Sequence, residues 1–504
     1  MIQLWIRDVC EGRLLGSRAR RQTACKERDM AAKDNMMKQG VSRRAVLAGM
    51  AGTALAGVFA PGLIGRASAA GNYKLDLGGY AGPELTSEPV TLRFMRQDFT
   101  PDVNALLEGA YAEFTAAYPN ITITEEKVPY GDLQKKLLVY VASNDAPDIM
   151  MGRTDFADAY HAGKVALPLQ DYFSPEYIAD VPDNLRAAAS SGGNLYCVPW
   201  ETSVMLLYFN RDLFAKAGVA TPPEVEGLEG GWTDEELIAN LEKVNAGLKA
   251  AGDNQSWALA AAGQGNGGPG ANYSQLESIW IRSQGDPNAA KDSSAWKTLM
   301  GISDDGLSVT GYIDTPEAIK GMQFYQSLFS KGLTPLGPVP NQFPGGLAAT
   351  YFGGLNFTNR FRVPGLEPPF KWGVSLPPKG NIVFNGNGSD SPLVWSKAKH
   401  PAEAVALLAF LCNDKNRLAF HKAWGSMPSR TSLREAMSEF ATEQPFKMAS
   451  ALSNASYSVP RTPGYFDYFN AMNPAVKDIA LGADPAKVLP ETAAKIDRLL
   501  AKYK

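Results

Sequence analysis

Histidine and cysteine are scarce in this chain of 504 residues. It contains three histidines and four cysteines, and none of them stand at the short spacings that metal sites use. They are His161, His400, His421, Cys10, Cys25, Cys197 and Cys412. A metal enzyme built on these side chains is therefore not expected, and no segment has the pattern of a cofactor-binding motif.

An excess of charge of one sign is also lacking. Lys and Arg number 49 against 52 for Asp and Glu, and neither sign forms a long run after the signal-like N-terminal region. Nucleic-acid-binding surfaces carry a clustered basic face, so no nucleic-acid partner is expected. Hydrophobic residues make up 45% of the chain, which is enough for a normal interior. The length favours two large lobes over one core.

The N-terminal region lacks an apolar run long enough to span a membrane. The run from Ala45 to Ala60 is short and weakly apolar, whereas a spanning helix needs roughly 20 strongly apolar residues. The pair Arg43-Arg44 precedes it, and Ala67-Ser68-Ala69 offers small residues to signal peptidase. No cysteine follows, which disfavours a lipid anchor. We predict export to the periplasm by the twin-arginine pathway, with cleavage near Ala69 or Ala70.

The predicted signal peptide covers residues 36–70 and is followed by a lead segment, 71–89. Residues 1–35 look like neither a signal nor a domain, so we hypothesise that translation starts at Met36 or Met37. A precursor whose mass includes residues 1–29 would contradict that start.

Cleavage would leave two cysteines, Cys197 and Cys412, in a compartment that permits disulfides. Cys412 shares an apolar helical face with Val405, Leu408 and Ala409, which favours a buried thiol. Whether the two cysteines pair stays open.

Residues 90–151 alternate between strands and helices. Strands are expected at 90–95, 121–128 and 147–151, with helices after Thr100-Pro101 and at 132–143. This βαβαβ order predicts an α/β fold with a parallel sheet. Ligands bind beyond the carboxyl ends of such strands, and Gln97, Asp98 and Asp155 stand there.

A buried strand with a polar beginning stands within residues 195–214. Val204 to Phe209 is a continuous apolar run, typical of a strand covered on both faces, and a short helix after it ends at Gly218. Trp200-Glu201-Thr202-Ser203 precede the run. These four residues either hold a polar ligand or simply face water, and their identities alone do not decide between the two.

A second group of elements follows. Helices are expected from a capping box at Thr233 and from Thr315, with later helices at 401–412, 414–424 and 486–503. Residues 370–376 are expected to be a strand that returns towards the first lobe. Segment 263–270 is glycine-rich but lacks the spacing of a phosphate loop, so we interpret it as a flexible loop.

The order of short motifs along residues 90–504 resembles that of the family-1 extracellular solute-binding proteins. These are the sugar-binding receptors of ABC importers, and they include the maltodextrin-binding proteins. The matching pieces are Glu113-Phe114, Tyr118-Pro119, Ala146 to Ile149, Leu195 to Pro199, Tyr208 to Phe214, Gly231-Trp232-Thr233, Pro316-Glu317-Ala318 and Trp424 to Arg430. No single piece is diagnostic, but their order and spacing together are specific.

The resemblance implies a two-lobe Venus-flytrap fold that closes on its ligand by a hinge motion. We place the three implied chain crossings at Trp200 to Ser203, near Trp372 to Leu376, and at Gly425 to Pro428. Lobe 1 then comprises 90–200 and 377–424, and lobe 2 comprises 201–376 and 425–504. The implied function is to capture a carbohydrate-like solute as a monomer and deliver it to membrane permease subunits, without catalysis or a cofactor.

The resemblance also places a ligand-binding acid at Asp155, whose alternative role is to cap the next helix. The other residues expected to contact ligand are Gln97, Asp98, Trp200, Glu201, Ser203, Trp280, Asn356, Trp424, Arg430 and Tyr465, with Phe466 as a further candidate. Aromatic rings would serve the apolar faces of a sugar, and the polar groups its hydroxyls. Trp280 fits a helix core equally well.

One departure from the family concerns the ligand. A glycine followed by tryptophan is frequent near residues 351–357, where this chain has no tryptophan. Asn356 or Phe357 would take that role, and a smaller sugar, a polyol or a substituted sugar becomes an alternative to a maltodextrin. Two other functions stay open: a carbohydrate-active enzyme using Glu201 and Asp155 as a carboxylate pair, and a receptor that serves a sensor.

Overall fold

The computed structural model describes residues 75–261, 275–337 and 339–504, which belong to one compact unit, Lys74–Lys504. The predicted start methionine, twin-arginine signal, cleavage site and glycine-rich segment 263–270 lie outside the described residues. Over the ranges that are described, no helix is both long and apolar enough to cross a membrane.

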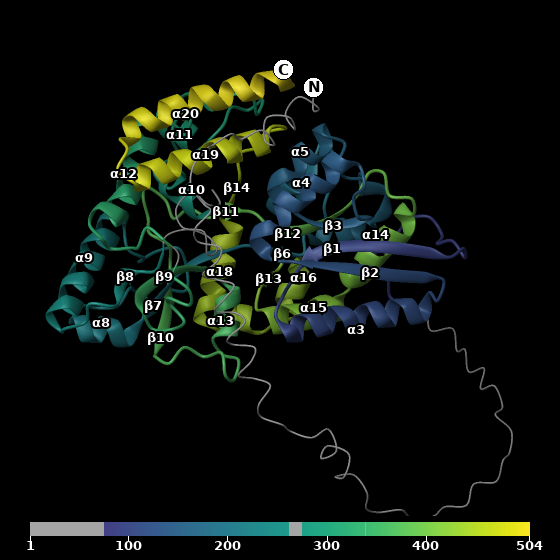
Figure 1. Ribbon diagram of the computed structural model, residues 1–504, viewed down its shortest axis with the longest axis horizontal. Helices are drawn as coiled ribbons and strands as arrows, with labels where there is room; N and C mark the ends of the chain where they lie inside the picture. The colour runs from purple at the N-terminus through teal and green to yellow at the C-terminus, as the bar shows by residue number, and fades with distance from the viewer. Residues whose placement is uncertain (1–74, 262–274, 338) are drawn as a thin grey trace, which may run out of the picture. The chain divides into compact units, whose positions relative to one another are not determined.

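The first sheet combines three parallel strands with one antiparallel strand (Figure 1). Strand β1 (Val90–Gln97) lies between β2 (Ile121–Val128) and β3 (Ile149–Arg153) and runs parallel to both. Strand β12 (Asp390–Val394) pairs antiparallel with β3 at the edge. The predicted parallel arrangement is confirmed, and β12 is an addition that the sequence analysis did not identify.

The second sheet is built around the apolar run of residues 195–214, which was predicted to be a buried strand. Strand β7 (Met205–Asn210) is buried at all six positions and lies between β10 (Trp372–Ser375) and β9 (Ala348–Gly354). Strand β8 (Trp257–Leu259) pairs with the other side of β9. The prediction that this run forms a strand covered on both faces is confirmed.

The strand predicted to return towards the first lobe belongs to the second sheet instead. Strand β10 pairs antiparallel with β7, from Trp372 opposite Asn210 to Ser375 opposite Leu207. The chain joins the first sheet at Asp390, so it passes from one sheet to the other after Ser375, close to the predicted crossing near Trp372 to Leu376, whose exact position stays a prediction. The apolar run identified a strand, but a run of apolar residues does not specify the strand with which it pairs.

Two of the predicted crossings lie side by side. Strand β6 (Glu201–Thr202) pairs antiparallel with β13 (Met427–Pro428), which places Thr202 opposite Met427. A second short pair joins β11 (Gly386–Asn387) to β14 (Tyr457–Ser458). The strands of each sheet fall within the predicted ranges of lobes 1 and 2, whose exact limits stay a prediction.

The predicted helices start and end close to the expected residues. They are α3 (Pro101–Ala117), α4 (Leu133–Ser143), α8 (Arg211–Ala217), α9 (Asp234–Ala250), α12 (Pro316–Ser330), α14 (Pro401–Leu411), α15 (Asp414–Trp424) and α20 (Pro485–Leu500). Helix α19 (Tyr465–Ala480) was not predicted. The capping box at Thr233 is confirmed, because Thr233 and Glu236 exchange hydrogen bonds. Thr100 stands at the start of α3 but makes no capping bond.

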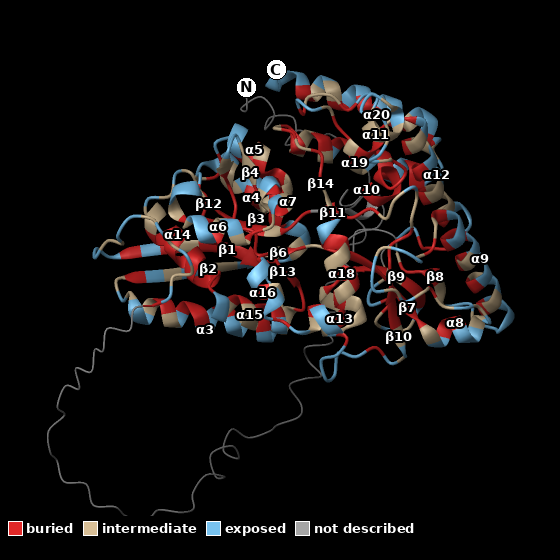
Figure 2. Ribbon diagram, turned by 180° about the vertical axis from the view of Figure 1, so that it is seen from behind, coloured by how far each residue is buried: buried red, intermediate tan, exposed pale blue. Residues whose placement is uncertain are grey.

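The helices bury one side against the rest of the unit, as Figure 2 shows for α19 and α20. Helix α14 is more extreme, because its residues from Glu403 to Leu411 are all buried. Cys412 follows it directly and is a buried free thiol, which confirms that prediction, and Cys197 is also buried and free. The two cysteines are therefore unpaired.

Candidate functional site

A cavity of about 240 Å³ lies where the ends of strands from both sheets meet the paired crossings. Its lining residues come from seven short stretches of the chain. They are Gln97, Tyr130, Glu201, Thr202, Ser203, Val204, Met205, Tyr351, Phe352, Gly353, Gly354, Leu355, Asn356, Phe357, Asp390, Trp424, Ser426 and Met427. Gln97 ends β1, which agrees with the rule that ligands bind beyond the carboxyl ends of parallel strands.

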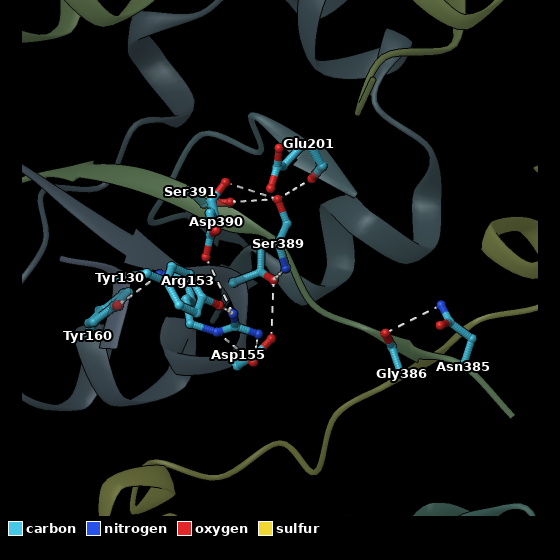
Figure 3. A network of polar contacts seen from close by, with 11 residues as sticks. Tyr130, Arg153, Asp155, Tyr160, Glu201, Asn385, Gly386, Ser389, Asp390 and Ser391 are labelled. Carbon is cyan, nitrogen blue, oxygen red and sulfur yellow. Dashed lines mark hydrogen bonds and ion pairs between the residues drawn. The ribbon is translucent and has the colours of Figure 1, made fainter. Parts of the chain in front are cut away.

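One side of the cavity, which we call the acidic wall, consists of Gln97, Tyr130, Glu201 and Asp390. Arg153 at the end of β3 organises it from behind (Figure 3). Its Nη2 lies 2.6 Å from a carboxylate oxygen of Asp155, and its Nη1 donates to the Tyr130 hydroxyl at 2.8 Å. The Asp390 carboxylate is a more distant partner, at 3.3 Å. Arg153 therefore neutralises Asp155 more completely than Asp390.

Hydroxyl groups fix the first residues of β12 against the crossing strand β6. The Ser389 hydroxyl donates to the backbone carbonyl of Glu201, and the Ser391 hydroxyl donates to Ser389 Oγ at 3.1 Å. The Thr154 Oγ1 accepts the Ser389 N–H at 3.0 Å. These bonds hold the backbones that carry Glu201 and Asp390, so the acidic wall is largely formed before a ligand arrives.

The two carboxyl groups of the acidic wall ionise less readily than ordinary acids. Burial raises the pKa of Glu201, and the nearby Asp390 carboxylate raises it further, while Ser426 and Arg417 act in the opposite direction. Burial also raises the pKa of Asp390, against the effect of Arg153. Removing a carboxylate from water disfavours its charged form unless a partner compensates. Both groups would gain from a ligand that brings hydrogen-bond donors or positive charge.

A second part of the lining, which we call the aromatic wall, comes from the other sheet and runs from Tyr351 to Phe357, over the end of β9 and the start of α13 (Asn356–Arg360). The rings of Tyr351 and Phe357 pack edge to face, with centroids 5.2 Å apart. The Tyr208 hydroxyl donates to the Gly354 carbonyl at 2.8 Å and bonds Thr358 at 2.9 Å. These contacts keep the aromatic rings in place where an apolar ligand face would lie.

The end of α15 closes the cavity between the two walls. Trp424 is half-buried, and its ring packs edge to face on Phe99 at 5.1 Å. Gly425 follows in the left-handed region, at φ 84°, and a Cβ there would lie 2.9 Å from the Asn356 carbonyl oxygen. A side chain at 425 would therefore push the end of α15 away from α13. The glycine lets Trp424 and Asn356 border the same cavity.

Five of the predicted ligand-binding residues line the cavity, and six do not. Those that line it are Gln97, Glu201, Ser203, Asn356 and Trp424, and Phe357 lines it as well. Those that do not are Asp98, Asp155, Trp200, Trp280, Arg430 and Tyr465. Contact with a ligand stays a prediction for all of these residues, and the structure places the second group outside this cavity.

Two residues of the second group are tryptophans that lie in the core. Trp200 is 2% exposed and packs against Phe94 and Phe420, with the Arg417 guanidinium 4.6 Å from its ring. Trp280 is 1% exposed and packs against Tyr325 and Phe352. Large aromatic side chains fill cores as readily as they line clefts. Neither ring is placed to stack on a ligand in this cavity.

Five other candidate residues have structural partners. Arg430 is buried and forms ion pairs with Asp180 and Asp414, rather than reaching a ligand. Tyr465 is buried, and its ring packs edge to face on Phe156 at 4.8 Å.

Phe466 packs on the same Phe156 ring as Tyr465, at 4.4 Å. Asp98 is exposed and accepts a hydrogen bond from Asn104. Asp155 lies behind the acidic wall as the close ion-pair partner of Arg153, and its charge also raises the pKa of Asp390. None of the three is in the cavity lining.

Sequence analysis missed Tyr130, Tyr351, Asp390 and Ser426. Tyr130 follows β2, so the strand-end rule that selected Gln97 also applied to it. Asp390 stands in Ser389-Asp390-Ser391, directly before the buried residues Pro392-Leu393-Val394. The same order, polar residues followed by an apolar run, is found at Glu201. The pattern therefore predicts a site residue at Asp390 as well.

Known proteins of related sequence and fold share this architecture. The sequence profile of the bacterial extracellular solute-binding proteins matches residues 98–417. A Brucella abortus protein named as a binding protein is 26% identical over 422 residues, which cover 82% of this chain and 93% of that protein.

Two solved structures share the fold with a TM-score of 0.65 and 16% identity, each over 82% of this chain and 100% of the other. One is an ABC substrate-binding protein from Listeria monocytogenes in complex with cycloalternan, and the other is the acarbose-binding GacH receptor of Streptomyces glaucescens. The profile match covers more than half of the sequence. The chain belongs to the bacterial extracellular solute-binding protein family.

Proposed function

We propose that this protein captures a carbohydrate-like solute in the cavity between the acidic and aromatic walls and delivers it to the membrane permease of an ABC importer. The observation that carries the proposal is the composition of the cavity. Hydrogen-bonding groups of Gln97, Glu201 and Asp390 face a site whose other side is aromatic. Sugars present hydroxyl groups at their edges and C–H groups on their faces, and need both kinds of surface.

Hinge closure is the step that couples capture to delivery. The pair β6–β13 supplies Glu201 and Met427 to the cavity and also carries two of the predicted crossings. A ligand that touches both walls stabilises the arrangement in which the walls are close, because only that arrangement offers both sets of contacts. The permease then selects the ligand-bound form. The protein acts as a monomer and reaches the periplasm by the twin-arginine pathway, which the pair Arg43-Arg44 and the motif Ala67-Ser68-Ala69 support.

Ligands of proteins with the same fold support the carbohydrate class. The solved complexes hold cycloalternan and acarbose, and a third neighbour, from Thermotoga lettingae, holds α-D-tagatose. That neighbour is 17% identical, with a TM-score of 0.65, over 81% of this chain and 99% of its own. These ligands differ greatly in size although the proteins share one fold. The fold therefore does not identify the solute, which must be measured directly.

The test is calorimetry and thermal unfolding of the chain from Gly71 onward with a panel of sugars, oligosaccharides and polyols. A true ligand at about 100 times its Kd should raise the unfolding free energy by roughly 2.7 kcal/mol. Trp424→Ala should weaken binding at least about tenfold, by loss of an aromatic platform. Trp296→Ala is the matched control, because Trp296 is equally half-exposed but lies on α11 (Ser294–Met300) outside the cavity lining. Absence of binding across the panel would reject the proposal.

A second candidate function, hydrolysis of a carbohydrate, is favoured by one observation: two carboxyl groups, Glu201 and Asp390, line the cavity together. The sequence suggested Asp155 as the second carboxyl group of such a pair, but Asp155 is held in an ion pair with Arg153. Glycosidases place one acid and one carboxylate on either side of the scissile bond. Product formation in the calorimetry samples would favour this candidate, whereas heat of binding without product favours the receptor.

A further inference from the structure

The cavity presents acids without a balancing cation. Among the described residues that line it, Glu201 and Asp390 are the charged side chains, and no Lys, Arg or His is present. A carbohydrate with a carboxylate or phosphate group would therefore meet like charge. Bringing like charges together in a partly buried site costs free energy that a neutral or positive ligand avoids.

The cations behind the acidic wall do not remove this imbalance. Arg153 is committed first to Asp155, at 2.6 Å, and lies 3.3 Å from Asp390. Arg417 lies over the Trp200 ring and donates to the Trp200 carbonyl at 3.1 Å, and its charge offsets only part of the effect of burial on Glu201. Three carboxyl groups thus share two guanidinium groups.

Glu201 also has an acceptor that the protein leaves unused. Its Oε2 is shielded from solvent and accepts no hydrogen bond of ordinary geometry, although the nearby Ser426 hydroxyl interacts with the carboxyl group and lowers its pKa. A buried acceptor without a donor is costly, and ligand sites are where such atoms are tolerated. The missing partner is a donor, and a donor with positive charge would form the stronger bond.

The remainder of the lining suits a positively charged carbohydrate. The rings of Tyr130, Tyr351, Phe357 and Trp424 belong to the lining, and aromatic rings attract cations as well as sugar C–H groups. The Phe357 ring already has the Arg360 guanidinium 6.0 Å from its centroid. The acids are not arranged for a bare metal ion, because no group of three or more His, Cys, Asp or Glu with metal-binding geometry occurs in the described part of the chain. Amide groups at Gln97 and Asn356 remain for hydroxyls.

We propose that the solute is an amino sugar, or an oligosaccharide containing one, whose free ammonium group binds between Glu201 and Asp390. This inference rests on the proposed function and narrows its substrate class. A quaternary ammonium compound fits less well, because it has no N–H to give to Glu201 Oε2. The raised pKa values of Glu201 and Asp390 agree with this assignment, since a bound ammonium group would compensate the burial that raises them.

The experiment is calorimetry at about pH 7 with ligands that differ only at one substituent. Glucosamine is compared with glucose and N-acetylglucosamine, galactosamine with galactose, and fully deacetylated chitobiose with cellobiose. Choline and glucuronate complete the set. In at least one series the free amine should bind about tenfold to a hundredfold more tightly than its neutral counterparts, the range of a charge-assisted hydrogen bond. Glucuronate should not bind.

Variants of Glu201 and Asp390 test whether these two residues cause the preference for the amine over neutral sugars. Glu201→Gln should reduce the ratio of amine affinity to neutral-sugar affinity about tenfold, and this ratio is the readout because Glu201 also belongs to the general sugar-binding surface. Asp390→Asn is the second variant in case Glu201→Gln does not fold, and circular dichroism establishes folding of each. Glu88→Gln is the matched control, because Glu88 is exposed and outside the lining, yet the substitution removes the same charge.

The outcomes separate the inference from the proposed function. Neutral sugars that bind as tightly as their amines would overturn the amino-sugar assignment and leave the carbohydrate function standing. Choline binding more tightly than every amino sugar would also overturn it. Failure of every carbohydrate to bind would overturn the proposed function, and the inference with it.

Discussion

The two walls of the cavity are built by different physical means. The acidic wall is held by ion pairs and hydrogen bonds that link β3, β6 and β12, with Arg153 at the centre. The aromatic wall is held by ring packing around Tyr351 and Phe357, and by the hydrogen bond from the Tyr208 hydroxyl to the Gly354 carbonyl. Charge networks fix directions closely, and ring packing fixes area more than direction. The acidic wall therefore determines which polar group is bound, and the aromatic wall contributes the contact area.

This difference predicts a different response to substitution on each side. A charged network fails as a unit, because removal of one member leaves the others buried without a partner. A packed aromatic surface loses contact area in proportion to what is removed. The variants below test that contrast, beginning with the largest expected effect.

Arg153→Met should destabilise the protein by about 3–5 kcal/mol, the range for breaking a buried ion pair on one side only. The side chains of Arg153 and Asp155 are 12% and 6% exposed, so Asp155 would be left charged and shielded from water. Urea unfolding followed by circular dichroism measures the loss. The double variant Arg153→Met, Asp155→Asn should recover part of it, because the unpaired charge is gone. A loss below about 1 kcal/mol for the single variant would mean that the acidic wall is not a cooperative network.

Glu201→Gln should change how stability depends on pH. Burial raises the folded-state pKa of Glu201 above its ordinary 4.5, so from about that pH upward the folded state keeps a proton that the unfolded state has lost. Stability then falls as pH rises through this window, until the folded carboxyl has also ionised. The glutamine variant lacks that decrease. The pKa of Glu201 rises to about 7, so relative to the wild type the variant should gain roughly 3 kcal/mol between pH 4.5 and 7.

The groups that act on Glu201 must stay constant in this comparison. They are Asp390 on β12, Arg153 on β3, Arg417 on α15, and the Ser426 hydroxyl. Denaturation midpoints of both proteins across the range, with Glu88→Gln as the surface control, give the measurement. Parallel pH profiles for wild type and Glu201→Gln would show that Glu201 ionises normally in the folded protein.

The elements of each wall were predictable where one local pattern decided them. The run Val204 to Phe209 is apolar at every position and forms a buried strand, and the capping box at Thr233 begins α9 as expected. The strand-end rule placed Gln97 correctly for the same reason. Patterns of this kind depend only on residues that are adjacent in the sequence, so the sequence is sufficient to identify them.

Positions that depend on distant partners were not predictable. Asp155 and Asp390 are both acids next to strand ends, yet a 2.6 Å contact with Arg153 draws Asp155 out of the lining and leaves Asp390 in it. Trp200 and Trp424 differ similarly, since Phe94 and Phe420 enclose the first while the second borders the cavity. Residue type gave each pair the same chemistry, and only the folded arrangement separated them.

On the aromatic wall, Phe357→Ala should cost about 1–2 kcal/mol of stability, less than a fully buried phenylalanine, because the ring is only half-buried. Carbohydrate affinity should fall about tenfold with the lost platform. Phe357→Leu should recover most of the stability and little of the affinity, since leucine restores apolar volume but not an aromatic face. Equal recovery of both would mean that the wall contributes only apolar volume. Calorimetry and urea unfolding of the three proteins make the comparison.

Asn356→Ala should have the smallest effect, and it tests whether the aromatic wall contributes any direction at all. Asn356 is a polar side chain of the cavity lining, next to Phe357 in sequence, and it is the first residue of α13, whose N-cap is Leu355. Loss of one neutral hydrogen bond to a ligand hydroxyl corresponds to about 1 kcal/mol, or roughly fivefold in Kd, with little change in unfolding. A loss as large as that of Glu201→Gln would mean that both walls orient the ligand. Unchanged affinity would leave orientation to the acidic wall alone, with the aromatic wall acting through contact area.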